Sequence, residues 1–162
     1  MATKRALAEH EIREARLVFA DALDYQRVVV VESWPWMQRL TRAETAFCLG
    51  NRTIFPRPIN TRMLNDMSWL IHEMTHVWQF QTRGWVYLIE ALWAQLKLGG
   101  AAAYNYGGQA GLEAASLTDA SIHNFNPEQQ GDIAKHYYRL FKLRRNKEAW
   151  EPFVEDIRRS RK

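Results

Sequence analysis

Two histidines and a glutamate stand close together in residues 69–81, WLIHEMTHVWQFQ, where they form the pattern H-E-x-x-H. Residues four apart on a helix lie one turn apart on the same face, so His72 and His76 would present their imidazoles side by side. Two imidazoles in this arrangement are ligands that a tetrahedral zinc ion accepts. Glu73 would then be placed as a general base for a water molecule whose pKa zinc lowers to about 7.

A buried helix that carries two histidines without a metal is the alternative interpretation of the same stretch. The residues around the polar triplet are apolar: Trp69, Leu70, Ile71, Met74, Val77, Trp78 and Phe80. A polar cluster buried among such side chains is costly unless something satisfies it. The zinc interpretation also requires a third ligand farther along the chain, and this requirement separates the two interpretations.

The segment FNPEQQGDIAKHYY, residues 125–138, offers that ligand at the start of a predicted helix. Asn126 suits the N-cap, Pro127 suits the first helical position, and Gln129 completes a capping box. Glu128 then lies in the first turn, with Asp132 one turn later on the same face. Glu128 can give a metal a carboxylate oxygen, and Asp132 can accept a hydrogen bond from the free ring nitrogen of a ligand histidine.

Taken alone, each of these two acids has a simpler explanation. Acidic residues favour helix N-termini through the helix dipole, which is sufficient for Glu128, and Asp132 alone could be a surface residue. The metal interpretation gains its weight from the combination of both acids with the histidine helix.

The elements that must position these residues follow from the periodicity of the chain. Residues 8–24 have apolar side chains at helical spacing, and the β-branched run RVVVVES, residues 27–33, predicts a buried strand. In TAFCLGNRTIF, the pair Gly50-Asn51 between two strand-like runs predicts a hairpin that ends before Pro56.

Helix is predicted again over residues 61–82 and 85–98, and a last long helix runs from Pro127 to about residue 145. The glycine-rich segment 99–111 predicts a mobile loop with a short strand around residues 104–106. The predicted fold class is therefore α+β: a small domain dominated by helix, with a short strand and hairpin region before the histidine helix.

One domain over residues 1–162 is the natural count for a chain of 162 residues without a Ser/Gly/Pro-rich linker. Hydrophobic residues form 47% of the chain, which is enough for a core. Much of the net charge of +4 lies near the end, and we interpret residues 146–162 as a solvated basic tail. No nucleic-acid motif accompanies this charge, so we expect no nucleic-acid partner.

The single cysteine, Cys48, excludes an intramolecular disulfide framework and fits a reducing compartment. Its place in a strand-like run favours a small buried residue over a nucleophile. The N-terminus has no apolar core of a secretory signal, and no run reaches the roughly 18 apolar residues of a membrane helix. We therefore expect synthesis in the cytoplasm, no membrane span, and export only by a route that reads no cleavable signal.

HEMTH (72–76) together with EQQGD (128–132) resembles the gluzincin arrangement of zinc metallopeptidases. The longer phrase LIHEMTHVWQFQ is similar to small metallopeptidase-like domains associated with contractile injection and type VI secretion systems. The runs ALAEHEIREARLVFADALDYQRVVVVE and CLGNRTIF resemble the same group, so the resemblance covers most of the chain.

This resemblance implies one zinc ion with His72, His76 and Glu128 as ligands, Glu73 as the base and Asp132 as support for a histidine. It also implies a zincin-like core in which a strand before the active helix lies along the cleft. Residues 53–55 are the best candidate for that strand, because an exposed edge can bind an extended peptide by strand addition.

One departure from the family is the short spacing of only about 50 residues between the second histidine and the third ligand. The second helical half of large gluzincins is nearly absent here. The resemblance therefore implies a shallow substrate pocket, or one that a partner completes.

The residue that would stabilise an oxyanion is not evident from the sequence. Four side chains near the predicted loop and last helix are candidates, although core packing or surface exposure explains each of them more simply: Tyr106, His123, His136 and Tyr137.

The leading functional hypothesis is a zinc metallopeptidase that hydrolyses a protein or peptide substrate, as a secreted effector or as a processing enzyme of a secretion system. The alternative is a catalytically silent zinc-binding scaffold or adaptor that contacts a secretion-system component. The presence of Glu73 favours the enzyme, because a structural zinc site needs a fourth protein ligand and no base. A basic nucleic-acid-associated protein ranks below both, since it would need no metal.

Overall fold

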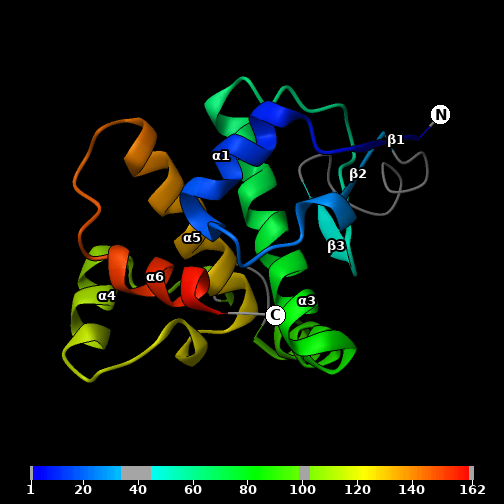
Figure 1. The fold of residues 1–162 in the computed structure, drawn as a ribbon. Helices are drawn as coiled ribbons and strands as arrows, with labels where there is room; N and C mark the ends of the chain where they lie inside the picture. The colour runs from blue at the N-terminus through cyan, green and yellow to red at the C-terminus, as the bar shows by residue number, and fades with distance from the viewer. Residues whose placement is uncertain (1, 34–44, 99–102, 161–162) are drawn as a thin grey trace.

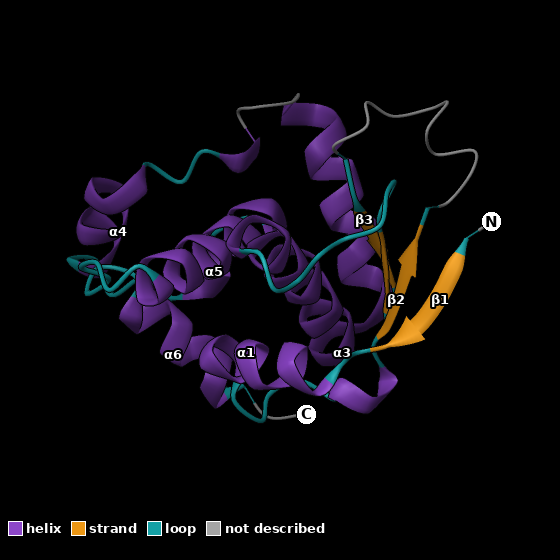
Figure 2. Cartoon of the chain, turned by 90° about the horizontal axis from the view of Figure 1, so that it is seen from above, coloured by secondary structure: helices purple, strands orange, loops and turns teal. Residues whose placement is uncertain are grey.

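The computed structural model describes residues 2–33, 45–98 and 103–160 of the chain. A small sheet lies on one side of the long helix α3 (Leu64–Leu98), and α5 (Pro127–Lys142) and α6 (Glu151–Arg159) lie on the other (Figures 1 and 2). Helix α1 (Glu9–Phe19) packs against α3, α5 and α6, and α4 (Gly108–Ser116) lies at the far end. This helix-dominated α+β architecture confirms the predicted fold class.

The sheet contains four strands in the order β1 (Thr3–Ala6), β2 (Val29–Glu32), β4 (Arg52–Ile54) and β3 (Phe47–Leu49). β1 is antiparallel to β2, β2 is parallel to β4, and β4 is antiparallel to β3. The hairpin between β3 and β4 turns at residues 50–51, as predicted, and Gly50 has a left-handed φ of 62° there. The strand predicted over residues 27–33 is present as β2, whereas β1 was not predicted.

The prediction that residues 53–55 form an exposed edge is wrong. β4 pairs with β2 on one side and β3 on the other, and Thr53 and Ile54 are buried. The apolar residues Val30 and Val31 of β2 cover the side that was expected to be open. In the described part of the chain, β3 is the edge strand on this side of the sheet, and it packs against α3.

Two helix boundaries differ from those predicted for the N-terminal half. α1 ends at Phe19 rather than near residue 24, because Ala20 has a positive φ of 45° and a 3-10 turn follows at Tyr25–Arg27. The break predicted between residues 82 and 85 is present as a kink, where Gly84 has φ 74° and ψ −167° inside α3. Such a φ is easy for glycine and strained for other residues.

In the glycine-rich segment, the structure has no strand at residues 104–106, and the predicted loop is present only over residues 105–107 of the described part. Residues 103–104 lie in a 3-10 turn, and α4 begins at Gly108; residues 99–102 are outside the described part of the chain. A Cβ on Gly111 would lie 2.2 Å from the Tyr106 carbonyl oxygen, so this glycine allows a close backbone approach. These glycines lie at the start of α4, where the missing side chain of Gly111 allows close packing of the backbone.

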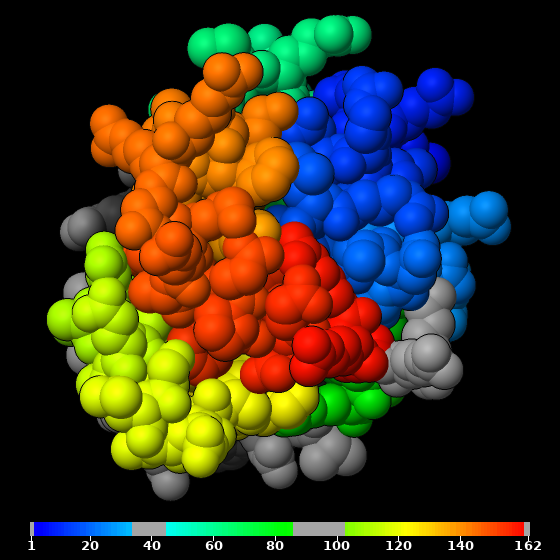
Figure 3. Space-filling view, turned by 60° about the vertical axis from the view of Figure 1, so that its left-hand side comes forward, coloured from blue at the N-terminus to red at the C-terminus, as the bar shows by residue number. Residues whose placement is uncertain are grey.

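The interpretation of residues 146–162 as a solvated basic tail is wrong for residues 146–160, which the structure describes. α6 buries three apolar side chains, Phe153, Val154 and Ile157, against the core, while its arginines face outward or form ion pairs. On the surface, α6 lies beside α1 (Figure 3). Residues 161–162 lie outside the described part of the chain.

Replacing Phe153 with Ala should lower the free energy of unfolding by about 3 kcal/mol or more, because its fully buried ring packs edge-on against Phe125 at 5.3 Å. Urea denaturation of the two proteins measures the difference. Phe141→Ala is the matched control, since Phe141 is a half-exposed ring on α5 and should cost clearly less. Equal losses for the two variants would mean that α6 contributes little to the core.

None of the helices that the structure describes has both the length and the apolar character needed to cross a membrane.

Candidate metal centre

The two histidines of the H-E-x-x-H pattern lie one turn apart on α3, and both are buried. Their Nε2 atoms are 3.3 Å apart. The Glu128 carboxylate, from the first turn of α5, lies opposite them, with Oε2 3.3 Å from His72 Nε2 and Oε1 3.6 Å from His76 Nε2. One ligand atom from each of these three side chains therefore lies within 4.8 Å of the others.

These separations fit a tetrahedral metal site. Nitrogen and oxygen ligands about 2.0–2.1 Å from a zinc ion are separated by roughly 3.3 Å along each edge of the tetrahedron. The two shortest separations in the site, 3.3 Å each, equal that edge, and the third is 3.6 Å. The buried group of His72, His76 and Glu128 can therefore hold a metal ion.

The α5 start that carries Glu128 folds as its local sequence dictates. The Asn126 side chain accepts a hydrogen bond from the Gln129 backbone N–H at 2.9 Å, and the Gln129 side chain accepts one from the Asn126 N–H at 3.0 Å. This is the predicted capping box, with Pro127 in the first turn. The cap fixes where the helix begins and so which residue of α5 faces the histidines.

The other ring nitrogen of each histidine has its own acceptor. His72 Nδ1 lies 3.0 Å from Asp132 Oδ1, and an ionised carboxylate can only accept, so this nitrogen carries the proton. His76 Nδ1 lies 2.8 Å from Gln79 Oε1. The Gln79 amide nitrogen donates to the Pro127 carbonyl at 3.1 Å and to Gln130 Oε1 at 2.9 Å, so its oxygen must face the histidine.

These hydrogen bonds decide which atoms are available to a metal. With both Nδ1 atoms protonated, the lone pairs of both Nε2 atoms point toward each other and toward the Glu128 carboxylate. Three acceptors this close repel one another unless a proton or a metal cation lies between them, so the donor set fits a metal ion when the rings are neutral. In this arrangement Asp132 and Gln79 fix the orientation and the tautomer of the two rings.

Gln79 is the residue of the site that the sequence analysis missed. It is fully buried, and it lies three residues after His76 and seven after His72 on the same face of α3. A polar residue at that position in an otherwise apolar helix was the available signal. Its second partner, the start of α5, could not be inferred from spacing along the chain.

Gln79→Ala should weaken zinc binding by about tenfold or more, because losing the outer partner of a ligand histidine typically costs that much. Competition with a chromogenic chelator measures the affinity. Gln109→Ala, at an exposed glutamine on α4, is the control and should bind zinc as the wild type does. An unchanged affinity for Gln79→Ala would remove Gln79 from the site.

The electrostatics of the site favour positive charge between the three side chains. Burial lowers the pKa of His72, but the hydrogen bonds with Asp132 and Glu128 outweigh it and raise the pKa to about 10. For His76, burial likewise acts downward, and the Glu128 carboxylate outweighs it, so the pKa is raised. Burial favours the neutral form of Glu128, yet the two histidines hold its pKa far below the usual range.

Glu73 is buried beside the ligands, with only 4% of its surface exposed. Its Oε2 atom has no hydrogen-bond partner among the described residues, and burial raises the pKa of the carboxyl group. An unpaired buried carboxylate costs free energy, so a fold that keeps one at this place has a use for it. Glu73 directly follows His72 on α3, and its carboxyl group lies close enough to both histidines to interact with them.

Cys48 lies on the edge strand β3, close enough to Glu73 for the two groups to interact. Burial raises the pKa of the Cys48 thiol well above its usual value, and the charge of Glu73 adds to the increase. The thiol donates to the Gly50 carbonyl oxygen at 3.3 Å. A thiol held protonated in this way is no nucleophile, which agrees with the role of a small strand residue.

Gly131 allows α5 to approach the histidine helix. A Cβ at this position would lie 2.7 Å from His72 Cε1 and 2.8 Å from His72 Nδ1, which is closer than real contacts allow. The glycine precedes Asp132, so the close approach is also what brings that carboxylate to the ring. A glycine in a helix interior costs about 1 kcal/mol relative to alanine, and here the cost is offset by the geometry of the site.

Gly131→Ala should weaken zinc binding by more than about tenfold without removing any ligand, because the added methyl group displaces the His72 ring from Asp132. Chelator competition measures the affinity, and circular dichroism reports whether α5 stays helical. Elsewhere in a helix this substitution is stabilising. An affinity equal to that of the wild type would show that the ring and α5 adjust without consequence for the site.

The four candidates for oxyanion stabilisation have other partners in the structure. The Tyr106 hydroxyl lies 2.6 Å from His136 Nδ1 and accepts a hydrogen bond from Trp150 Nε1 at 3.0 Å. The buried Tyr137 donates to Glu151 Oε1 at 3.0 Å, which directs its hydroxyl toward α6. His123 stacks on Trp78 at a partly exposed position.

Tyr104 is the tyrosine that lies against a ligand histidine. Its ring centroid is 6.1 Å from that of His72, and the two ring planes are tilted by 32°. Tyr104 falls in the short strand predicted around residues 104–106 and was not among the predicted site residues. It reaches the site because the 3-10 turn at residues 103–104 directs it there, and no signal in the local sequence reveals that approach.

Comparison with known proteins gives one relative in sequence and one in structure, while no protein-family model matches the chain. The type VI secretion system spike protein VgrG2b of Pseudomonas aeruginosa is 31% identical over 140 residues, which cover 83% of this chain and 13% of the spike protein. The solved effector domain of Pseudomonas aeruginosa VgrG2b superposes with a TM-score of 0.62 at 27% identity, over 98% of this chain and 84% of that one. In sequence and in fold, this chain is similar to the effector domain of a type VI secretion spike protein.

Proposed function

We propose that this chain is a zinc-dependent peptidase that acts as an effector of a type VI secretion system. The observation that carries the proposal is the convergence of two imidazole nitrogens and a carboxylate at tetrahedral separations, beside a buried carboxylate with an unpaired oxygen. The similarity to the effector domain of VgrG2b supports the association with secretion.

Zinc is the metal that this donor set suits best. Two imidazoles and one carboxylate are the ligands of many catalytic zinc sites, which keep their fourth position open for water or substrate. When bound, zinc would supply Lewis acidity that polarises a carbonyl group and makes water more acidic. The three ligands are held by α3 and α5, which are packed together, so the site is organised before a metal binds.

In the proposed reaction, Glu73 accepts a proton from the attacking water and passes it to the nitrogen of the leaving amine. Its raised pKa suits both halves of this transfer, because a base whose pKa lies nearer neutrality also serves as an acid. Its unpaired Oε2 is the atom that would carry the proton. Asp132 and Gln79 keep the two imidazoles in the tautomer that leaves Nε2 for the metal.

We propose that an extended peptide binds along β3, the edge strand beside the site. Cys48 of this strand is near Glu73, and its neighbours Phe47 and Leu49 are 38% and 48% exposed. The free backbone groups of an edge strand can pair with an added strand, and the alternating side chains give it apolar contacts. This mode would place the substrate backbone next to the general base.

A catalytically silent zinc scaffold remains the alternative from another class of function. A closed structural site uses a fourth protein ligand. Within the described residues, the metal-binding group contains three side chains, and the neighbouring acid Glu73, which is not one of them, has an oxygen without a partner. Both features favour the enzyme over the scaffold.

Hydrolysis of an unfolded protein by the purified chain tests the peptidase proposal. We expect casein to be cleaved by the zinc-loaded protein, cleavage to stop with a chelator, and activity to return when zinc is added back. Cleavage that resists the chelator would exclude a metal-dependent reaction. Zinc binding without cleavage of several unfolded substrates would favour the scaffold.

The proposed partner is a component of the secretion spike, and the proposed destination is outside the cell that makes the chain. The relative in which a similar domain occurs is itself a spike protein, of which this chain matches only a part. Detection of the chain in culture medium, in cells with and without a working contractile sheath, tests this proposal. Release that does not depend on the sheath would contradict it.

A further inference from the structure

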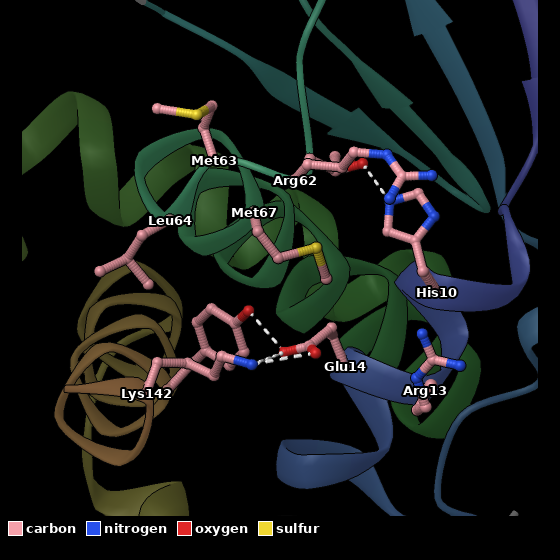
Figure 4. A pocket seen from close by; sticks show the side chains of 10 residues that line it. His10, Arg13, Glu14, Arg62, Met63, Leu64, Met67 and Lys142 are labelled. Carbon is pink, nitrogen blue, oxygen red and sulfur yellow. Dashed lines mark hydrogen bonds and ion pairs between the residues drawn. The ribbon is translucent and has the colours of Figure 1, made fainter. Parts of the chain in front are cut away.

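A cavity lies between the start of α1, the start of α3 and the end of α5 (Figure 4). It shares no residue with the candidate metal centre. Its volume is about 400 Å³, enough for one or two side chains of a partner. The residues that decide its character are His10, Arg13, Arg62, Met63, Met67 and Lys142. Neither the proposed reaction nor the proposed strand addition uses any of them.

The charge on the cavity wall is mainly positive. Of the three cations, Lys142 is compensated, because it donates to the Glu14 carboxylate at 3.0 Å, and that carboxylate also accepts a hydrogen bond from Tyr138 at 2.8 Å. Arg13 and Arg62 are exposed, and neither guanidinium forms an ion pair with the residues that the structure describes. The N-terminus of α3, which begins at Leu64, adds the positive end of a long helix dipole.

The same cavity has an apolar side formed by methionine. Met63 is 61% exposed, whereas Met67, one turn later on α3, is buried at the base of the cavity. Methionine side chains adapt their shape to an incoming group, and an exposed one is common at peptide-binding surfaces. The cavity therefore combines two arginines that form no ion pair with the described residues and an adaptable apolar surface.

The wall opposite the methionines is connected by a chain of buried and partly buried hydrogen bonds. His10 Nε2 lies 2.8 Å from Thr61 Oγ1, and the Thr61 hydroxyl donates to Glu11 Oε1 at 2.7 Å. Glu11 in turn accepts two hydrogen bonds from Arg5, at 2.7 and 2.8 Å. A cavity whose wall is already fixed needs little ordering when a ligand binds.

We propose that this cavity binds an acidic peptide segment of a protein partner, with an apolar side chain against Met63 and Met67 and carboxylates beside Arg13 and Arg62. A small inorganic anion would pair with the arginines but leave Met63 exposed to water. A purely apolar segment would cover the methionines and leave both guanidinium groups uncompensated. A segment that alternates acidic and apolar residues satisfies both sides of the cavity.

Methionine-methyl NMR of the full chain tests the proposal, with Glu73→Gln as the background so that the probe is not cleaved. The probe is a short acetylated peptide of alternating Glu and Leu. We expect the methyl signals of Met63 and Met67 to shift on titration, whereas that of the buried Met74 on the same helix stays in place. Met74 also reports whether each variant is folded.

Two matched controls separate charge at the cavity from net charge. Arg62→Glu should weaken binding by at least about tenfold, and Arg159→Glu, an equal change of charge at the exposed end of α6, should not. A peptide with Gln in place of Glu should also bind more weakly. Unshifted methionine signals, equal binding of the Gln peptide, or the same shifts with sodium sulfate alone would each overturn the proposal.

Discussion

Glu73→Gln should lose about a thousand-fold in kcat while keeping its zinc, a loss within the range that a positioned general base contributes. The amide matches the carboxylate in size but cannot accept the proton of the attacking water. Zinc content should stay at the wild-type value, because the proposed ligands are His72, His76 and Glu128. The free energy of unfolding should not fall, since the carboxylate that is removed has an unpaired buried oxygen.

Casein cleavage and elemental analysis on the same preparations measure both quantities. Glu113→Gln, the same exchange at an exposed acid on α4, is the control and should leave both unchanged. A variant that keeps its activity would exclude Glu73 as the base. A variant that loses its zinc would make Glu73 a ligand or a structural support of the site.

Glu128→Ala should weaken zinc binding by more than about 100-fold, a larger loss than outer partners of ligands cause. The substitution removes one of the three proposed ligands and, with it, a charge that raises the pKa of both histidines. The pKa of His72 should therefore fall below about 10 in this variant, while the hydrogen bond with Asp132 continues to raise it. Cleavage should be lost together with the metal.

Chelator competition measures the zinc affinity, and NMR titration of the histidine side chains in metal-free protein measures the pKa. Glu148→Ala, at an exposed acid in the loop between α5 and α6, is the matched control. Retention of tight zinc binding by Glu128→Ala would assign the third ligand to another side chain. A drop in affinity for the control would indicate an effect of net charge instead.

The three proposed ligands were accessible from the sequence because the rules that place them are local. Helical periodicity puts His72 and His76 on one face, and the capping box at Asn126 fixes where α5 begins. Together they place Glu128 in the first turn of α5. The contact between α3 and α5 is not local in the sequence. It could still be inferred, because two histidines and a glutamate are residue types that bind one metal ion together.

The residues that refine the site depend on contacts between elements, and these could not be predicted. Gln79 gains its role from the carbonyl of Pro127 and the side chain of Gln130, both about fifty residues away along the chain. Gly131 gains its role from a clash that exists only once α5 is packed on His72. Neither contact can be inferred from the composition of the chain or from the spacing of its residues.

The position of residues 53–55 at an exposed edge was predicted wrongly for a related reason. The pairing of β2 with β4 is parallel, so it depends on a connection between distant segments and not on a turn that a dipeptide can reveal. The hairpin of β3 and β4 was predicted correctly because Gly50 and Asn51 mark a local turn. Thr53 therefore lies in the interior of the sheet, and β3 takes the place beside the metal centre.

The solvated tail was predicted wrongly because the basic composition of these residues was given more weight than the helical spacing of their apolar side chains. The arginines of residues 158–162 suggested a solvated tail, although Phe153, Val154 and Ile157 repeat at helical spacing before them. The structure buries these three side chains in α6, while Arg158 forms ion pairs and Arg159 is exposed. An amphipathic test over residues 150–159 would have found the helix.

X-ray absorption at the zinc edge of the loaded protein tests the proposed centre directly. We predict one zinc ion per chain with nitrogen and oxygen neighbours at about 2.0–2.1 Å and the multiple scattering of two imidazoles. A sulfur neighbour at about 2.3 Å would place Cys48 on the metal and contradict the proposed ligands. A chain that takes up no zinc would return His72 and His76 to the role of ordinary buried histidines.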